Sequence, residues 1–241
     1  MIGAGTVGLL TAAVALRTGC SAVTITDVDE GRVSYALKKG FATHGYVVPN
    51  PSQDSTYGST INSGTATPRS PVDTNVRTAS SLLASSIQGQ LQYAKGLAGE
   101  VLALTKPPPE LHDEDEDEGV DITFECTGKE ICMHTGLYAT RPGGKLIMVG
   151  MGTPIQTLPL SVAHLREIDI LGVFRYANTY AAGIRLLCTA SVPGAMGNFP
   201  SLDDMITHRF KGLESAKQAF ELACRTSDDE GNLVIKVVIE A

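Results

Sequence analysis

The sequence predicts an α/β fold, a doubly wound parallel sheet with helices on both faces, and three observations lead to this prediction. A glycine-rich turn with the pattern G-x-G-x-x-G opens the chain at residues 3–8. An apolar helical run and a short strand follow, and the strand ends at Asp27. Between residues 120 and 190, apolar strands alternate with helical segments. Such alternation is typical of parallel sheets, because parallel strands are usually connected by a helix.

The opening turn has the pattern of a Rossmann-type dinucleotide-binding βαβ unit. Gly3 allows the tight turn, Gly5 lets a pyrophosphate approach the backbone, and Gly8 allows the helix to pack closely on the sheet. The N–H groups at the start of the helix attract phosphate. Asp27 follows Gly8 by 19 residues, where a carboxylate accepts hydrogen bonds from ribose hydroxyls and repels a 2′-phosphate. We therefore expect NAD to bind in preference to NADP.

The strand that this unit needs before its glycine turn is nearly absent from the sequence. Only Met1 and Ile2 precede Gly3, and in the usual strand order that strand lies near the middle of the sheet. We therefore expect a sheet that lacks its first strand, in a chain that is cut at its amino terminus.

Hydrophobic spacing predicts the other elements of the dinucleotide-binding domain, which we place at residues 1–204. The predicted helices span 29–40, 82–104, 129–139 and 179–190, and the predicted strands span 22–26, 46–48, 120–125, 145–149 and 168–174. Residues 142–144, with the sequence Pro-Gly-Gly, are predicted to form a turn.

A tail at residues 205–241 has a different organisation. We expect a short strand at 206–210, a helix at 213–224 and a final strand at 233–239. The final strand is more apolar than an exposed edge strand should be, so it needs a partner.

Residues 50–118 are predicted to be a largely flexible insertion in the dinucleotide-binding domain. Ser, Thr, Pro, Asn and Gly dominate residues 50–81, and such a segment buries too little apolar surface to offset its ordering entropy. We interpret the acidic run at 113–118 as a solvated loop, with a metal or histone site as the alternative.

Charge and composition limit the possible partners. The formal net charge is −7 and no basic patch is evident, which argues against a nucleic-acid partner. The five cysteines show no CxxC pair or metal-binding spacing; they are Cys20, Cys126, Cys132, Cys188 and Cys224. We expect reduced thiols in a cytoplasmic protein. The apolar runs are too short to span a membrane, and no signal peptide begins the chain.

Several stretches resemble the zinc-dependent medium-chain dehydrogenases, specifically the branch of polyol dehydrogenases that act on sorbitol and xylitol. The stretches are GAGTVGLL, TITDVDEGRVSYALKKG, DITFECTG, GLYATRPGGKLIMVGMG, REIDILGVFRYANTY and THRF. The resemblance is to the carboxy-terminal, NAD-binding half of these enzymes and covers most of the chain outside residues 50–118. It implies the reversible oxidation of a sugar alcohol to a ketose with NAD. It also leaves a homo-oligomer open, since family members are usually dimers or tetramers.

The resemblance further implies roles for single residues. The adenosine and pyrophosphate would be held by Gly3, Gly5, Thr6, Val7, Gly8, Asp27 and Arg32. The nicotinamide side would be lined by Cys126, Thr127, Val149, Gly150, Met151, Val173, Phe174 and Arg175. Arg175 and Tyr176 would reach the substrate hydroxyls. A solvated helix residue is an equal alternative for Arg32, and a structural ion pair is the alternative for Arg175.

The chain departs from the family at the zinc site. In that family the zinc ligands belong to a separate domain before the glycine turn, and this sequence has no such domain. The five histidines form no recognisable zinc triad; they are His44, His112, His134, His164 and His208. We therefore expect no catalytic residue and no metal site in this chain, and we expect its tail to pack on the missing zinc domain. Without zinc nothing lowers the pKa of the alcohol, so we expect the chain alone to be inactive.

Three interpretations remain open at this point. The first is a polyol dehydrogenase represented by an incomplete chain, and the second is a non-catalytic NAD-binding or regulatory protein. The third is a short-chain-type reductase that works without metal. Tyr35 and Lys39 have the required Tyr-x-x-x-Lys spacing, but they belong to the helix after the second strand, far from the nicotinamide.

Overall fold

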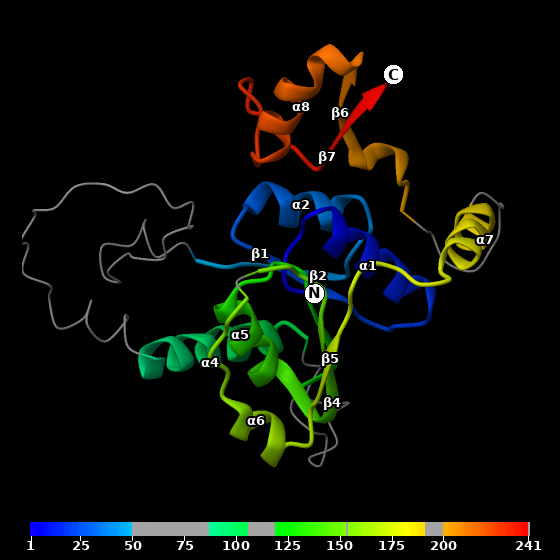
Figure 1. The fold of residues 1–241 in the computed structure, drawn as a ribbon. Helices are drawn as coiled ribbons and strands as arrows, with labels where there is room; N and C mark the ends of the chain where they lie inside the picture. Colours follow the sequence, from blue (N-terminus) through cyan, green and yellow to red (C-terminus); the bar gives the residue numbers. More distant parts are fainter. Residues whose placement is uncertain (50–86, 106–118, 153, 191–199, 241) are drawn as a thin grey trace, which may run out of the picture.

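A parallel sheet with helices on both faces forms the centre of the protein (Figure 1). The computed structural model describes residues 1–49, 87–105, 119–152, 154–190 and 200–240. Strand β1 (Thr24–Asp27) pairs with β2 (His44–Val47), and β4 (Thr140–Met148) pairs with β3 (Val120–Glu125) and β5 (Asp169–Gly172). All of these pairs are parallel, so the predicted α/β fold with a parallel sheet is confirmed.

The first residues of the chain lie between the two groups of strands. Ile2 forms parallel bridges with both Thr26 and Glu125. Its N–H donates to the carbonyl of Phe124 at 2.9 Å. The spatial order is therefore β2, β1, the first residues, β3, β4 and β5, which is the doubly wound order. The strand that we expected to be lacking is represented, among the described residues, by this short pairing segment.

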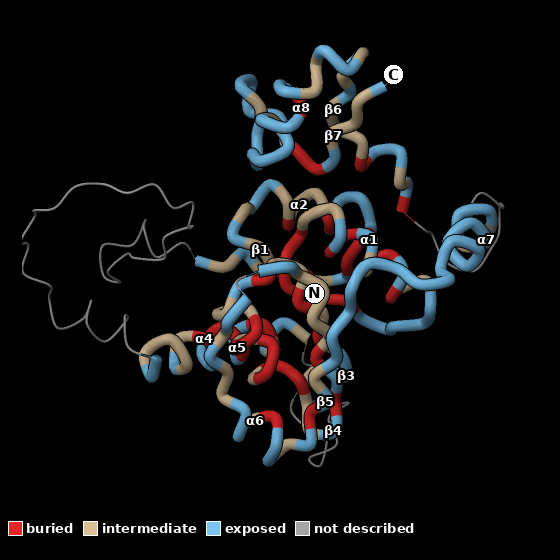
Figure 2. Tube along the Cα trace, viewed as in Figure 1, coloured by how far each residue is buried: buried red, intermediate tan, exposed pale blue. Residues whose placement is uncertain are grey.

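The helices cover the two faces of the sheet in two sets. From the centre the chain winds first towards β2 and then, after crossing back, towards β5. Right-handed crossovers therefore place α1 (Thr6–Arg17) and α2 (Glu30–Lys38) on one face. The other face carries α4 (Ile87–Ala103), α5 (Glu130–Ala139) and α6 (Leu160–Leu165). Helix α7 (Tyr180–Ala190) follows β5 and is largely exposed (Figure 2).

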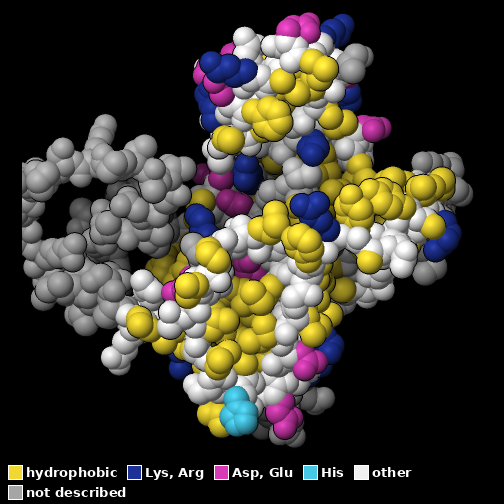
Figure 3. All heavy atoms as spheres, viewed as in Figure 1, with side chains coloured by type: hydrophobic (Ala, Val, Ile, Leu, Met, Phe, Trp, Pro, Cys, Tyr) yellow, Lys and Arg dark blue, Asp and Glu magenta, His cyan; other side chains and the backbone are white. Residues whose placement is uncertain are grey.

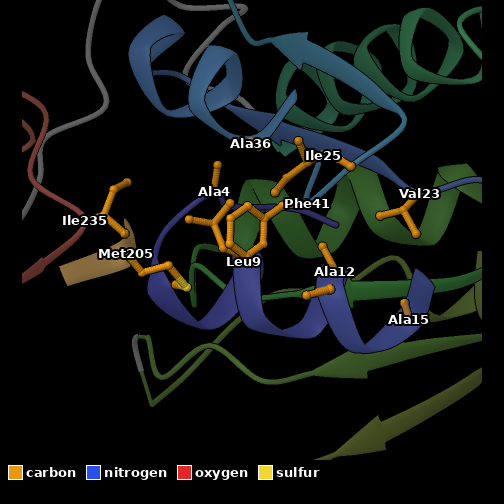
Figure 4. Close-up of a cluster of buried hydrophobic side chains, with 12 residues drawn as sticks. Ala4, Leu9, Ala12, Ala15, Val23, Ile25, Ala36, Phe41, Met205 and Ile235 are labelled. Atoms are coloured by element: carbon orange, nitrogen blue, oxygen red, sulfur yellow. The ribbon is translucent and has the colours of Figure 1, made fainter. Parts of the chain in front are cut away.

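Each face has its own hydrophobic cluster. The cluster under α1 and α2 contains Leu9, Ala12, Ile25, Ala36 and Phe41, among others (Figure 4). The cluster under α5 and α6 contains Met133, Leu137, Leu146, Ala163 and Ile168. Apart from Met205 and Ile235 of the tail, the residues of each cluster come from strands and helices that follow one another in the chain, as expected for βαβ units.

Local signals in the sequence account for the bounds of α2. Asp29 precedes the helix and its Oδ1 accepts the N–H of Arg32 at 3.0 Å, which is an N-cap interaction. Gly40 follows the helix with φ of +77°, a conformation that glycine adopts without strain. The predicted helix at 29–40 is therefore confirmed apart from its ends.

The turn that we predicted at residues 142–144 lies inside β4 instead. Val120 pairs with Thr140, and Ile122 pairs with Lys145. Four residues of β4 thus stand against a single residue of β3, which is an irregularity of the bulge type. Gly143 adopts φ of +67° there, and Pro142 is tolerated because a bulge needs no ladder hydrogen bond from it. The glycine and proline signal was correct, but the strand continues past it.

Other elements differ from prediction in extent. Strand β5 ends at Gly172, before the predicted end at residue 174, and the short helix α6 was not predicted. The helix predicted at 82–104 is confirmed as α4 from residue 87 onward. The rest of the predicted insertion, residues 50–86 and 106–118, lies outside the described residues, and so does its acidic run.

The tail forms a small βαβ unit beside α2 (Figure 1). Its elements are η2 (Asp203–Met205), β6 (Ile206–Lys211), η3 (Leu213–Ser215), α8 (Ala216–Ala223) and β7 (Lys236–Glu240). The final strand finds its partner in β6, in parallel register, and the predicted helix at 213–224 is divided between η3 and α8. Met205 and Ile235 join the hydrophobic cluster of α1 (Figure 4). The division at residue 205 and the packing of the tail on a further domain stay predictions.

Among the residues that the structure describes, every helix is too short or too polar to cross a bilayer.

Candidate cofactor site

The glycine turn between the first residues and α1 is too tight for side chains. A Cβ atom on Gly8 would lie 1.9 Å from the carbonyl oxygen of Gly3, a distance that excludes any residue but glycine. Gly3 itself has φ of +100°. Gly5 occupies the N-cap position of α1 and offers no capping side chain. The first N–H groups of the helix therefore remain available for an anion.

Asp27 lies beside this turn at the carboxyl end of β1. Its Oδ2 accepts the N–H of Ala4 at 2.7 Å, and its Oδ1 accepts the N–H of Asp29 at 3.0 Å. The two hydrogen bonds fix the carboxylate at the edge of the glycine turn. Sequence spacing predicted this neighbourhood, and the structure confirms that Asp27 and the glycine turn are in direct contact.

The turn after β3 is in contact with the glycine turn. A Cβ atom on Gly3 would lie 2.8 Å from Cγ2 of Thr127. Cys126 precedes Thr127, and burial raises the pKa of its thiol to about 11, so this thiol is neutral at pH 7. The structure thus brings two predicted groups together, the phosphate-binding glycines and the Cys126–Thr127 pair.

Glu125, the last residue of β3, has a carboxylate that holds this turn together. The side chain is buried, with 1% of its surface exposed. It accepts the Thr127 N–H at 2.7 Å, the Gly128 N–H at 2.9 Å and the hydroxyl of Thr127. Sequence reasoning treated Glu125 only as the end of a strand. Its signal is an acidic side chain that closes an apolar strand directly before Cys-Thr-Gly.

The turn after β4 interlocks with the turn after β3. A Cβ atom on Gly150 would lie 2.1 Å from the nitrogen of Gly128 and 2.8 Å from Oε2 of Glu125. The N–H groups of Val149 and Gly150 both donate to the backbone carbonyl of Glu125 at 2.8 Å. The side chain of Met151 points outward and is 82% exposed. These two turns therefore form one continuous wall at the carboxyl ends of β3 and β4.

The residues after β5 join this wall only at their start. Val173 donates its N–H to the carbonyl of Met148 at 3.0 Å. Phe174 and Tyr176 are exposed. The guanidinium of Arg175 lies 5.2 Å from the centre of the Phe174 ring. No described contact links residues 174–176 to the glycine turn. Exposed hydrophobic side chains continue along α7 (Figure 3).

The tail contacts the glycine turn from the other side. The hydroxyl of Thr6 donates to the carbonyl of Ile235 at 2.7 Å. The guanidinium of Arg32 donates to the carbonyl of Val234 at 3.3 Å, and one of its nitrogens lies 3.8 Å from the position of a Cβ on Gly5. Sequence reasoning placed Arg32 near the adenosine but missed the tail as a neighbour, since no local pattern links residues so far apart.

The part of the chain that the structure describes contains no group of three His, Cys, Asp or Glu side chains placed to hold a metal ion. These residues therefore do not fit zinc. Tyr35 and Lys39 also lie away from the site. The ring of Tyr35 stacks on Phe41 with 6.0 Å between centres, and the ammonium of Lys39 pairs with Asp204 at 2.7 Å. The geometry thus gives the short-chain reductase interpretation no support.

Comparisons with known proteins place this arrangement among dehydrogenases. The family of zinc-binding dehydrogenases matches residues 81–189. The sorbitol dehydrogenase of Mus musculus is 32% identical over 221 residues, which are 92% of this chain and 44% of that protein. The sorbitol dehydrogenase of Homo sapiens is 46% identical over 101 residues, which are 42% of this chain and 26% of that protein. The chain thus spans less than half the length of these relatives.

Solved structures show the same fold. The L-idonate 5-dehydrogenase of Escherichia coli str. K-12 superposes with a TM-score of 0.58 at 19% sequence identity. That likeness covers 100% of this chain and 49% of the other.

Proposed function

Since this chain belongs to the zinc-binding dehydrogenase family, we propose that it binds NAD and serves the oxidation of a sugar alcohol to a ketose. The observation that carries the proposal is the contact between the Asp27 carboxylate and the N–H of Ala4 in the glycine turn. Ligands of such sheets bind outside the carboxyl ends of the strands, where the strand order reverses. The substrate class comes from the relatives, which are sorbitol dehydrogenases.

The shape of the glycine turn fits a dinucleotide. The space that a Cβ on Gly8 would fill is occupied by the backbone of Gly3, so a phosphate meets backbone N–H groups and no side chain. We assign the adenosine and pyrophosphate to Gly3, Gly5, Thr6, Val7, Gly8, Asp27 and Arg32. When bound, NAD supplies the acceptor for the hydride that leaves the alcohol carbon.

The wall formed by the turns after β3 and β4 is the proposed nicotinamide side. We assign to it Cys126, Thr127, Val149, Gly150 and Met151, together with Val173, Phe174 and Arg175 from the end of β5. The interlocked backbones at Gly128 and Gly150 give this wall a fixed shape, which favours orientation of a bound ring. Arg175 and Tyr176 are the proposed contacts to the substrate hydroxyls, and the exposure of Tyr176 leaves it accessible.

Selection of NAD over NADP follows from the charges at the adenosine side. The carboxylate of Asp27 repels a 2′-phosphate. The carboxylate therefore favours a ribose with free hydroxyls. The guanidinium of Arg32 is hydrogen-bonded to the carbonyl of Val234 and keeps its charge, so the preference rests on Asp27.

Zinc has no role in this proposal, because the described residues do not fit it. That the chain alone is inactive stays a prediction, as do a homo-oligomer and a cytoplasmic location. A second candidate function is therefore a non-catalytic NAD-binding or regulatory protein. It is supported by the described residues, which include a glycine turn that suits a dinucleotide and no group of side chains placed to hold a metal ion.

Cofactor binding and turnover, together with the coding sequence upstream of Met1, separate the two functions. The 241-residue chain is titrated with NAD and NADP, and then assayed for sorbitol and xylitol oxidation with NAD and added zinc. Turnover measured as NADH absorbance supports the dehydrogenase. NAD binding without turnover is expected of the chain alone under both functions; an in-frame zinc domain in the coding sequence upstream of Met1 then supports the dehydrogenase. A chain that binds neither cofactor contradicts both.

A further inference from the structure

We propose that Glu125 is a positioning residue whose buried negative charge favours the oxidised cofactor over the reduced one. The proposal rests on the proposed function, because it concerns the nicotinamide side of the same site. The oxidised nicotinamide ring carries a positive charge that the reduced ring lacks. A fixed anion behind the ring therefore stabilises the two forms unequally.

The partners of Glu125 suit an ionised carboxylate. Its oxygens accept the N–H groups of Thr127 and Gly128 and the hydroxyl of Thr127. Each of these groups acts as a donor, and an ionised carboxylate is an acceptor on both oxygens. Hydrogen bonds to an ionised acceptor are the stronger kind.

The position of Glu125 places this charge inside the wall proposed for the nicotinamide side. The residue ends β3, next to the point where the strand order reverses, and the turn of Thr127 and Gly128 wraps around its carboxylate. Its Oε2 lies 2.8 Å from where a Cβ on Gly150 would stand, so the carboxylate touches both turns of the wall. With only 1% of the residue exposed, water screens its charge weakly.

A purely structural role is the competing explanation. If the carboxylate only ties the two turns together, its loss loosens the wall for both forms of the cofactor to the same degree. An electrostatic role changes the ratio of the two affinities. Two unit charges about 10 Å apart at an effective dielectric constant of about 20 interact with an energy that corresponds to roughly tenfold in a binding constant.

The test measures Kd for NAD+ and for NADH on the full chain by calorimetry and by NADH fluorescence. Glu125→Gln keeps the shape and removes the charge, whereas Glu125→Asp keeps the charge. We expect Glu125→Gln to weaken NAD+ relative to NADH by roughly tenfold, and Glu125→Asp to retain the wild-type ratio. Asp121→Asn is the matched control, because Asp121 lies at the other end of the same strand with an exposed side chain. It should leave the ratio unchanged.

Each other outcome is decisive. Equal weakening of both forms by Glu125→Gln overturns the proposal and leaves the proposed function intact. If that variant does not fold, the pair Glu125→Gln with Thr127→Val removes the hydroxyl together with its acceptor and is measured in the same way. Failure of both to fold shows a structural role and also overturns the proposal. If the unmutated chain binds neither form, the proposed function fails and this proposal fails with it.

Discussion

The hydroxyl of Thr6 donates a 2.7 Å hydrogen bond to the backbone carbonyl of Ile235, across 229 residues of sequence. Thr6 is the first residue of α1 and follows the glycine that a pyrophosphate would approach. Ile235 stands directly before the last strand of the tail and is buried in the cluster of α1. The tail is therefore attached to the proposed cofactor site, and its attachment can be tested apart from cofactor binding.

Replacing Thr6 with Val should loosen the tail. The substitution keeps the size of the side chain and leaves the carbonyl of Ile235 without its donor, so we expect a loss of about 0.5–1.5 kcal/mol in unfolding free energy. Amide hydrogen exchange in β6 and β7 should become faster. Thr18→Val is the matched control, because the hydroxyl of Thr18 bonds to the carbonyls of Val14 and Ala15 at the far end of α1. Unchanged exchange in the tail of the Thr6 variant would contradict the coupling.

Removing the charge of Asp27 should narrow the preference for NAD over NADP. Asp27→Asn keeps a carbonyl oxygen for the N–H of Ala4 and abolishes the repulsion of a 2′-phosphate. We expect the Kd for NADP divided by the Kd for NAD to fall by about tenfold or more, since juxtaposed like charges cost several kcal/mol. Titration of both cofactors measures the ratio, with Glu30→Gln as a neighbouring charge control. Equal affinities in the unmutated chain would refute the assignment.

Gly8→Ala should destabilise the protein and abolish cofactor binding. Its Cβ would meet the carbonyl oxygen of Gly3 at 1.9 Å, and both are backbone positions that must shift. Overpacking of this kind costs about 1–3 kcal/mol. Gly99→Ala in α4 is the matched control, because open space surrounds that position, and it should raise stability by about 0.5–1 kcal/mol. Urea denaturation measures the unfolding free energy of the two variants, and titration with NAD measures cofactor binding. A Gly8→Ala variant as stable as Gly99→Ala would be inconsistent with the tight turn.

Asp228 should give the tail a stability that depends on pH. Its carboxylate accepts the side-chain amide of Asn232 at 2.8 Å and the N–H of Glu230 at 2.9 Å. These hydrogen bonds, that of the Asn232 side chain first, lower the pKa of Asp228 to about 2. Its pKa in the unfolded chain is near 3.9. The ionised carboxylate therefore stabilises the folded state above about pH 4, and this contribution is lost as pH falls to about 2.

The measurement compares melting temperatures of the wild type and of Asp228→Asn between pH 5 and pH 2. At pH 5 the variant should melt at a lower temperature, and the difference should shrink towards pH 2. Asp229→Asn is the control, because the side chain of Asp229 is 90% exposed. A difference that stays constant with pH would contradict the assignment.

Local patterns predicted the dinucleotide-binding core of this protein well. The glycine turn, the helix after it and Asp27 follow one another directly in the sequence, and the hydrogen bond between Ala4 and Asp27 spans only 23 residues. Strand β3 was predicted with both ends correct, because an acidic run and Gly119 precede it and the Cys-Thr-Gly turn follows it. The element order then fixed which strand ends share an edge of the sheet, and so brought Cys126 and Thr127 to the glycine turn.

Features that depend on contacts between distant segments could not be predicted in this way. The role of Glu125 depends on two turns that fold around its carboxylate, and its sequence context shows only an acid after a strand. The tail meets Thr6 and Arg32 through backbone carbonyls, which every residue has. The bulge in β4 was mistaken for a turn, because glycine and proline favour both.

The pairing of Ile2 with both Thr26 and Glu125 has a consequence for how the protein opens. The strands on either side of Ile2, β1 with β2 and β3 with β4 and β5, each pack against their own hydrophobic cluster. Units of this kind often open as separate foldons, each with its own free energy of opening. A dinucleotide that contacts both Asp27, at the end of β1, and Thr127, after β3, would link the two groups of strands. The bound cofactor would thus act as a part of the architecture, converting two cooperative units into one.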